Sequence, residues 1–175
     1  MPVAEWNPVY LSAAVAWSLA GAVLDWRTRR VPNLLTVSGV VFGACLHLLT
    51  GGWRGLASAT LAALIAMALF GVFFLAGGMG GGDVKLMAAV AAMAGMSNLL
   101  SLLLATALLG GVLAIVFAWA HRRLTQTLTR LFRLWCQASG FSVSEVLPHE
   151  PLYLPYGVAI AAGASFTFLS VVLVR

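Results

Sequence analysis

Residues 84–119 decide the fold, and they read VKLMAAVAAMAGMSNLLSLLLATALLGGVLAIVFAW. Apart from Lys85 this run carries no charged side chain. As one continuous helix it would be roughly 54 Å long at 1.5 Å per residue. The hydrocarbon core of a bilayer is only about 30 Å thick, so the run is too long for a single span. The sequence GMSN at 95–98 offers a break, and we predict two helices here, over about residues 84–96 and 98–119.

The composition of the whole chain is typical of a membrane protein. Of its 175 residues, 62% are hydrophobic and 9% are charged, and the mean hydropathy is +1.00. A soluble domain carries about 25% charged residues. The length allows one domain and no appended soluble module. We therefore predict an all-α membrane protein in which a single polytopic domain covers residues 1–175.

Other apolar runs approach the length of about 20 residues that a transmembrane helix needs. They cover about residues 7–24, 34–50, 55–76 and 152–174. The first has no basic segment before it and no clear small-residue cleavage site after it, so a retained helix is expected rather than a removed signal peptide. The sequence thus predicts about six transmembrane helices.

Arginine clusters predict the topology, because basic residues are enriched in cytoplasmic loops. One cluster follows the first span and another follows the fifth: Arg27, Arg29 and Arg30, and then Arg122, Arg123, Arg130 and Arg133. Six spans put both clusters in the cytoplasm and both termini outside, whereas a single span over 84–119 would place the second cluster outside. Since these clusters account for much of the net charge of +5, nucleic acid is not an expected partner.

Residues 121–137, HRRLTQTLTRLFRLWCQ, predict an amphipathic helix on the cytoplasmic surface of the bilayer. Its apolar residues recur at helical spacing, with arginines elsewhere around the helix: Leu124, Leu128, Leu131 and Trp135. This pattern is typical of an interfacial membrane anchor, which we favour over a dedicated partner-binding helix.

No cofactor or metal site is predicted. The two cysteines, Cys45 and Cys136, lie far apart and form no CxxC pair, so neither a zinc site nor a thiol redox motif is indicated. The histidines His47, His121 and His149 are scattered and share no motif, so no chemistry is assigned to them.

The only two aspartates of the chain, Asp25 and Asp83, are the candidate catalytic residues. Asp25 ends the first span and Asp83 begins the fourth, and ionisable groups beside a membrane are functional candidates by default because burying them is costly. An even number of spans separates them, so both are expected at one membrane face. Taken singly, Asp25 could be a boundary residue and Asp83 a helix cap. Two acids on one face favour catalysis.

Paired aspartates suit the hydrolysis of a peptide bond. Two carboxyl groups a few ångströms apart share one proton, because both cannot be ionised at once. The ionised partner activates a water molecule as general base, and the protonated partner donates to the scissile carbonyl and then to the leaving amine. The glycines before Asp83 would let a substrate backbone approach closely; they are Gly77, Gly78, Gly80, Gly81 and Gly82.

At these two aspartates the chain resembles a known family. The segments DWRTRRVPNLLT at 25–36 and GMGGGDVKLM at 78–87 are similar to the two signature regions of the type IV prepilin peptidases, which are GxGD-type aspartyl proteases. The residues that match the first signature include Asp25, Arg29, Arg30, Pro32, Asn33 and Thr36, and those that match the second are Gly80, Gly81, Gly82, Asp83 and Lys85. LPYGVAIAAG at 154–163 resembles the family's segment that opens the last helix, here with Pro155, Tyr156 and Gly157.

The resemblance implies an endopeptidase of the bacterial inner membrane. Such enzymes remove the short basic leader from prepilins and pseudopilins at the cytoplasmic edge of the bilayer, just after a glycine, with the residues that correspond to Asp25 and Asp83 as catalytic pair and no cofactor. Larger members carry paired CxxC motifs and also N-methylate the pilin. Since this chain lacks those cysteines, it resembles the short peptidases of tight-adherence (Flp-type) pilus systems, and methylation is not expected. The oligomeric state stays open.

For some residues of the two signature segments, a structural role and a role in catalysis are both possible. Lys85 either extends its charge toward the bilayer surface or tunes the charge of Asp83. Pro32 and Asn33 are expected to shape the turn into the second span rather than to contact substrate.

Two other functions compete with the protease. A small ion-coupled transporter or channel could use the acids as proton or cation sites, but it predicts carboxylates near mid-membrane and an internal repeat, and neither is visible. A non-enzymatic assembly subunit would not need two acids on one face beside a glycine-rich turn.

Overall fold

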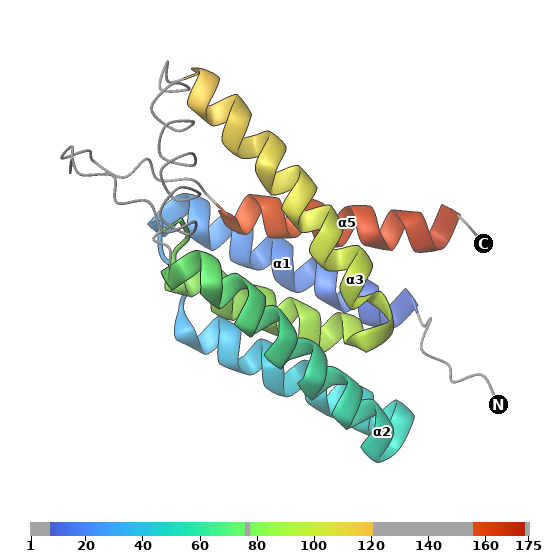
Figure 1. The fold of residues 1–175 in the computed structure, drawn as a ribbon. Helices are drawn as coiled ribbons and strands as arrows, with labels where there is room; N and C mark the ends of the chain where they lie inside the picture. Colours follow the sequence, from blue (N-terminus) through green and yellow to red (C-terminus); the bar gives the residue numbers. More distant parts are fainter. Residues whose placement is uncertain (1–7, 76–77, 121–155, 174–175) are drawn as a thin grey trace, which may run out of the picture. The chain divides into compact units, whose positions relative to one another are not determined.

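The computed structural model describes residues 8–75, 78–120 and 156–173, and all the secondary structure in these ranges is helical (Figure 1). The helices are α1 (Pro8–Thr28), α2 (Asn33–Leu75), α3 (Gly81–Ala120) and α5 (Tyr156–Leu173). Each of them is long and apolar enough to cross a membrane. The prediction of an all-α membrane protein is thus confirmed for the described residues, whereas the predicted amphipathic helix at 121–137 and the motif residue Pro155 lie outside them.

The chain divides into two compact units, and the predicted single polytopic domain over residues 1–175 stays a prediction. The first comprises Met1–Gly110 together with Pro155–Arg175, and the second comprises Gly111–Leu154. Both aspartates and every contact described below belong to the first unit. The second unit contains the end of α3, from residue 111 to residue 120.

Helix α2 reverses its direction at Gly52, whose φ of 59° and ψ of −148° are not helical. A straight helix of its 43 residues would be about 65 Å long. Both ends of α2 nevertheless reach the beginning of α3. Lys85 Nζ donates a hydrogen bond to Asn33 Oδ1 at 2.9 Å, and a Cβ added to Gly81 would lie 3.4 Å from the ring of Phe74. The two parts of α2 therefore run antiparallel, as Figure 1 shows.

Helix α3 is interrupted at Gly95, inside the sequence GMSN that predicts a break. Its φ of 73° and ψ of 173° favour glycine, because other residues rarely adopt a positive φ. Beyond Gly95 the helix runs beside α5. A Cβ on Gly163 would lie 2.7 Å from Thr106 Cα, and one on Gly110 would lie 3.4 Å from the Cβ of Ala159. The earlier residue of α5, Ala159, thus faces the later residue of α3, Gly110, and the later residue of α5, Gly163, faces the earlier one, Thr106. These two helices are therefore antiparallel.

The break in α3 leaves backbone groups that no helical turn can pair, and side chains bind them. His47 Nε2 donates to the carbonyl of Met93 at 3.0 Å, and Asn98 Nδ2 donates to the carbonyl of Ala94 at 3.0 Å. Ser58 Oγ accepts a backbone N–H of the following segment at 3.0 Å. Such partners are required where a helix ends away from water. The chain can therefore interrupt α3 inside an apolar bundle.

The first segment of α3 lies in the interior of the first unit, since residues 86–95 are all buried. A helix that is apolar on every side is expected in such a position. Glycines on the neighbouring helices bring them close to it. A Cβ on Gly21 of α1 would lie 2.6 Å from the Leu86 side chain, and one on Gly43 of α2 would lie 2.9 Å from backbone atoms of Ala92 and Met93. Small residues are the usual means of close packing between membrane helices.

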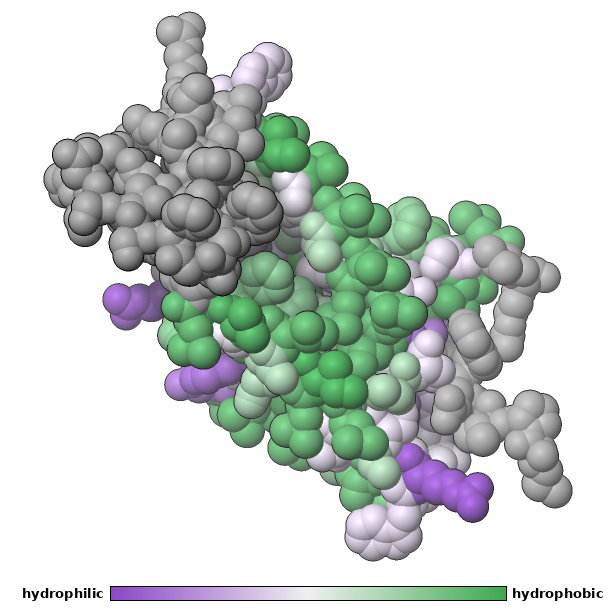
Figure 2. Space-filling model, in the orientation of Figure 1, coloured by the Kyte–Doolittle hydropathy of each residue, from purple (hydrophilic) through white to green (hydrophobic). Residues whose placement is uncertain are grey.

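Large apolar side chains cover the outside of the helices. Leu34, Leu49 and Leu75 are more than four-fifths exposed, and the face in Figure 2 is mostly hydrophobic over the helices. Soluble monomers rarely expose contiguous apolar patches larger than a few hundred Å². This surface and the four long apolar helices are those of a multi-pass membrane protein.

Candidate active site

Asp25 lies in the last turn of α1 and is only 1% exposed. The helix ends just beyond it. Arg29 has a φ of 52°, and its N–H donates to the carbonyl of Asp25 at 2.8 Å. A residue in the left-handed region whose N–H binds a carbonyl of the last turn is a common helix terminus. The chain thus turns toward α2 immediately after it has placed Asp25 in the interior.

Asp83 lies in the first turn of α3 and is 6% exposed. Its N–H donates to the carbonyl of Gly80 at 3.1 Å, which begins the helix. The side chain folds back over the same residue, because a Cβ on Gly80 would lie 2.9 Å from Asp83 Oδ2. Asp83 Oδ1 is buried and has no hydrogen-bond partner among the described residues. Such an atom is rare in a folded protein and calls for an explanation.

Asp25 and Asp83 lie at the same end of the first unit, although they are 58 positions apart in the sequence. The reason is that the turn after α1 packs against the start of α3, where a Cβ on Gly82 would lie 3.2 Å from the Cβ of Val31. The first turn of α5 reaches the same point, where the N–H of Gly157 donates to Asp25 Oδ2 at 3.3 Å. The candidate site is therefore built from the end of α1 and the beginnings of α3 and α5.

The glycines before Asp83 have a packing role that the sequence analysis did not anticipate. A Cβ on Gly82 would lie 3.2 Å from the Cβ of Val31, and one on Gly81 would lie 3.4 Å from the ring of Phe74. Both positions therefore bring the start of α3 close to α2 and to the turn before it. Their predicted role in substrate approach stays a prediction.

Lys85 and Asn33 hydrogen-bond to each other, which joins the two signature segments directly. Lys85 is exposed, and it lies two residues after Asp83, so the two side chains project from different sides of α3. The carbonyl of Pro32 accepts the N–H groups of Leu35 and Thr36 at 3.1 and 3.3 Å, which begins α2. Pro32 and Asn33 thus shape the turn into α2, as the sequence predicts.

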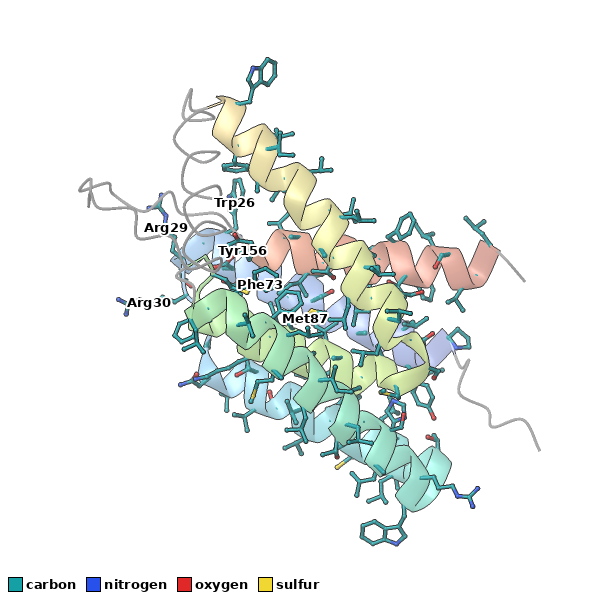
Figure 3. All side chains as sticks on the ribbon, viewed as in Figure 1. Trp26, Arg29, Arg30, Phe73, Met87 and Tyr156 are labelled. Atoms are coloured by element: carbon teal, nitrogen blue, oxygen red, sulfur yellow. The ribbon has the colours of Figure 1, made fainter. Side chains whose placement is uncertain are left out.

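Basic side chains gather at the aspartate end of the helices. Arg27, Arg29 and Arg30 are exposed, and Figure 3 shows Arg29 and Arg30 extending away from the end of α1. Lys85 is exposed at the same end, while Arg54 lies near the reversal of α2 at Gly52, far from both ends of that helix.

Tyr156 is the first residue of α5 and is partly buried (Figure 3).

Within the described ranges, no group of three or more His, Cys, Asp or Glu side chains could hold a metal ion. The contact of His47 with the carbonyl of Met93 was not predicted from the sequence. A histidine inside an apolar helix is itself a signal, because an ionisable group within a membrane needs a partner.

Comparison with known proteins gives one finding. A family model described as the type IV leader peptidase family matches residues 12–115, which include both aspartates and more than half of the chain. The match ends before α5, so it does not cover Tyr156 and Gly157. A search of the curated proteins and a search of the solved structures found no significant match.

Proposed function

The chain belongs to the type IV leader peptidase family, and from this premise we propose that Asp25 and Asp83 together hydrolyse the bond between a prepilin and its leader. Membership makes the protein a membrane protease that acts on prepilin leader peptides. The observation that supports the aspartate pair is that two buried carboxyl groups, from the end of α1 and the start of α3, lie at the same end of the first unit, and that one of them has an oxygen without a hydrogen-bond partner in the described part of the chain.

Asp83 Oδ1 is the atom that we assign to water or substrate. Leaving a buried acceptor unpaired costs about 1–3 kcal/mol, so a fold retains such a group where a ligand completes it. One proton is shared between Asp25 and Asp83, and it belongs to the pair rather than to either residue.

Water is the only co-reactant in this reaction. The ionised carboxylate takes a proton from water as the water oxygen bonds to the scissile carbonyl carbon, and the protonated carboxyl group donates to the carbonyl oxygen. The C–N bond of the resulting tetrahedral diol then breaks. One carboxyl group of the pair donates a proton to the leaving amine, while the other accepts the proton of a hydroxyl group as the new carboxyl group forms. Each carboxyl group therefore acts once as an acid or a base in every step, and the pair returns to its starting protonation.

The proposed topology has six spans with both aspartates on the cytoplasmic face of a bacterial inner membrane. The reversals at Gly52 and Gly95 support six spans, because they divide α2 and α3 into two segments each. The side is supported by Arg27, Arg29 and Arg30, which lie at the aspartate end, since basic residues favour the cytoplasm. Single cysteines at positions 30 and 54, labelled from outside with a membrane-impermeant reagent, test this: only position 54 should react in intact cells.

Flp-type prepilins or pseudopilins are the proposed substrates. The support for a prepilin or pseudopilin substrate is the similarity of the segments at 25–36 and 78–87 to the two signature regions of the type IV prepilin peptidases, and the Flp-type class is the narrower proposal that the next experiment tests. A panel of prepilins from Flp-type and other type IV systems, each incubated with the same enzyme, separates this substrate class from a broader one.

Leader removal in a reconstituted system tests the aspartate pair. The purified protein in phospholipid vesicles should shorten a Flp-type prepilin, and mass spectrometry should locate the cut just after a glycine. Asp25→Asn and Asp83→Asn should each lower the rate by at least about 10²-fold, because each removes an acid–base group. Cleavage at the wild-type rate by either variant would contradict the pair. An ion flux that depends on the acids, without cleavage, would favour the transporter instead.

A further inference from the structure

Helix α5 contributes a backbone group to the candidate site. The N–H of Gly157, in the first turn of α5, donates to Asp25 Oδ2 at 3.3 Å, and this hydrogen bond is buried. The first N–H groups of a helix have no partner within the helix itself. One of these open donors therefore points at a carboxylate that the proposed mechanism uses.

The approach of α5 to Asp25 depends on glycine. A Cβ at position 157 would lie 3.1 Å from the Cβ of Asp25, 3.2 Å from Asp25 Oδ2 and 3.2 Å from the Cα of Ala22. The last of these atoms belongs to the backbone and cannot rotate away. A side chain at position 157 would therefore separate α5 from α1 or turn the carboxyl group of Asp25.

Packing further along α5 holds this donor in place. A Cβ on Gly163 would clash with Thr106 Oγ1 and would lie 2.7 Å from Thr106 Cα, so α5 and α3 are in direct backbone contact there. Residues 159–161 and 164 of α5 are buried as well. A donor that is fixed before the reaction needs no reorganisation during it, which is the property of an effective catalytic dipole.

We propose that Gly157 is a positioning residue, whose N–H holds Asp25 in the orientation in which it meets Asp83. The inference rests on the proposed role of Asp25 in the aspartate pair. It extends the functional site to α5, which lies beyond the residues matched by the family model. Gly157 acts through Asp25 and contacts neither water nor substrate, so its effect is expected on turnover and not on substrate binding.

Gly157→Ala and Gly157→Pro separate the two contributions of this residue. Alanine keeps the N–H and adds the Cβ, whereas proline also removes the N–H, and proline is tolerated in the first turn of a helix. Gly71→Ala is the matched control, because a Cβ there would meet no atom within 4 Å. Cleavage of a Flp-type prepilin is measured in vesicles over a range of pH, together with thermal unfolding of each variant.

The expected result is a loss in kcat of about tenfold for Gly157→Ala and a larger loss for Gly157→Pro, with KM within about twofold of wild type, since one hydrogen bond to a charged group is at stake. The shape of the pH profile of kcat should change as well. If a variant merely contains less folded enzyme, kcat falls by the same factor at every pH and the shape of the pH profile is unchanged. A changed shape therefore indicates that Asp25 is misplaced, and an unchanged shape indicates a loss of folded protein.

An unchanged profile shape with wild-type kcat per folded enzyme in Gly157→Ala would overturn the inference, as would a Gly157→Pro variant that turns over as fast as Gly157→Ala. If Gly157→Pro does not fold, Gly157→Ala decides the matter. A wild-type protein that cleaves no prepilin, or active Asp25→Asn and Asp83→Asn variants, would instead remove the proposed function on which the inference rests.

Discussion

Lys85 Nζ donates a hydrogen bond to Asn33 Oδ1 at 2.9 Å and so joins α2, the helix after Asp25, to α3, the helix that carries Asp83 in its first turn. The two residues are 52 positions apart, and each stands in a different signature segment. The bond closes the turn between α1 and α2 onto the first turn of α3. It therefore bears on the relative position of the two aspartates without touching either.

Lys85→Met and Asn33→Ala should each slow leader removal, and the double variant should be no slower than the slower single variant. The reason is that both substitutions break the same bond. Because the pair is exposed, each loss should stay below about tenfold. A double-mutant cycle on kcat/KM measures the coupling. Losses that multiply in the double variant would show that the two side chains act independently.

Gly80→Ala should lower the cleavage rate by more than about tenfold with little loss of stability. The added Cβ would lie 2.9 Å from Asp83 Oδ2, and the end of a side chain can move aside, so the carboxyl group would shift rather than the helix. Displacement of a catalytic group by about 1 Å costs on the order of 10²-fold in rate. Prepilin cleavage and thermal unfolding are measured on the same preparation, with Gly71→Ala as the glycine control. Full activity in Gly80→Ala would place Asp83 outside the reacting geometry.

Much of this arrangement follows from the sequence, because hydrophobic length and charge are local properties. The excess length of residues 84–119 and the GMSN segment predict the break, and the structure has it at Gly95. The even number of spans between Asp25 and Asp83 predicts that both lie at one face, and in the structure the end of α1 and the start of α3, which carry them, lie at the same end of the first unit.

The remainder depends on contacts between distant segments, which no local pattern encodes. The bond from Gly157 to Asp25 joins residues 132 positions apart, and the contact of His47 with Met93 joins residues 46 apart. The packing role of Gly81 and Gly82 was missed for a related reason. A glycine that serves close approach and a glycine that serves flexibility look alike in a sequence, and only the neighbours Phe74 and Val31 distinguish them.

Gly43→Ala should destabilise the protein by about 1–3 kcal/mol, the usual cost of overpacking a core. The added Cβ would lie 2.9 Å from Ala92 C and Met93 N, which are backbone atoms that no side-chain rotation can move. Unfolding by denaturant in detergent micelles measures the change, and Gly71→Ala should leave the midpoint unaltered or raise it, because alanine is the better helix former. A Gly43→Ala variant as stable as wild type would mean that α2 and α3 are packed less closely than described.

His47→Leu should destabilise the protein while leaving turnover per folded molecule unchanged. His47 is 6% exposed, its ring stacks on Tyr10 with centroids 4.2 Å apart, and its Nε2 donates to the carbonyl of Met93. Leucine fills the space but leaves that carbonyl unpaired, at a cost of about 1–3 kcal/mol. The carbonyl of Met93 adjoins the break at Gly95. This break and Asp83 lie at opposite ends of the first segment of α3, so the reacting groups should stay in place.

Thermal unfolding and single-turnover cleavage of a prepilin, both corrected for the folded fraction, measure the two quantities for this variant. His47→Gln is the matched substitution, because its amide can donate to the same carbonyl, and it should recover part of the lost stability. If His47→Leu slows the cleavage step itself in fully folded enzyme, the polar contacts at the break in α3 also determine where that segment holds Asp83.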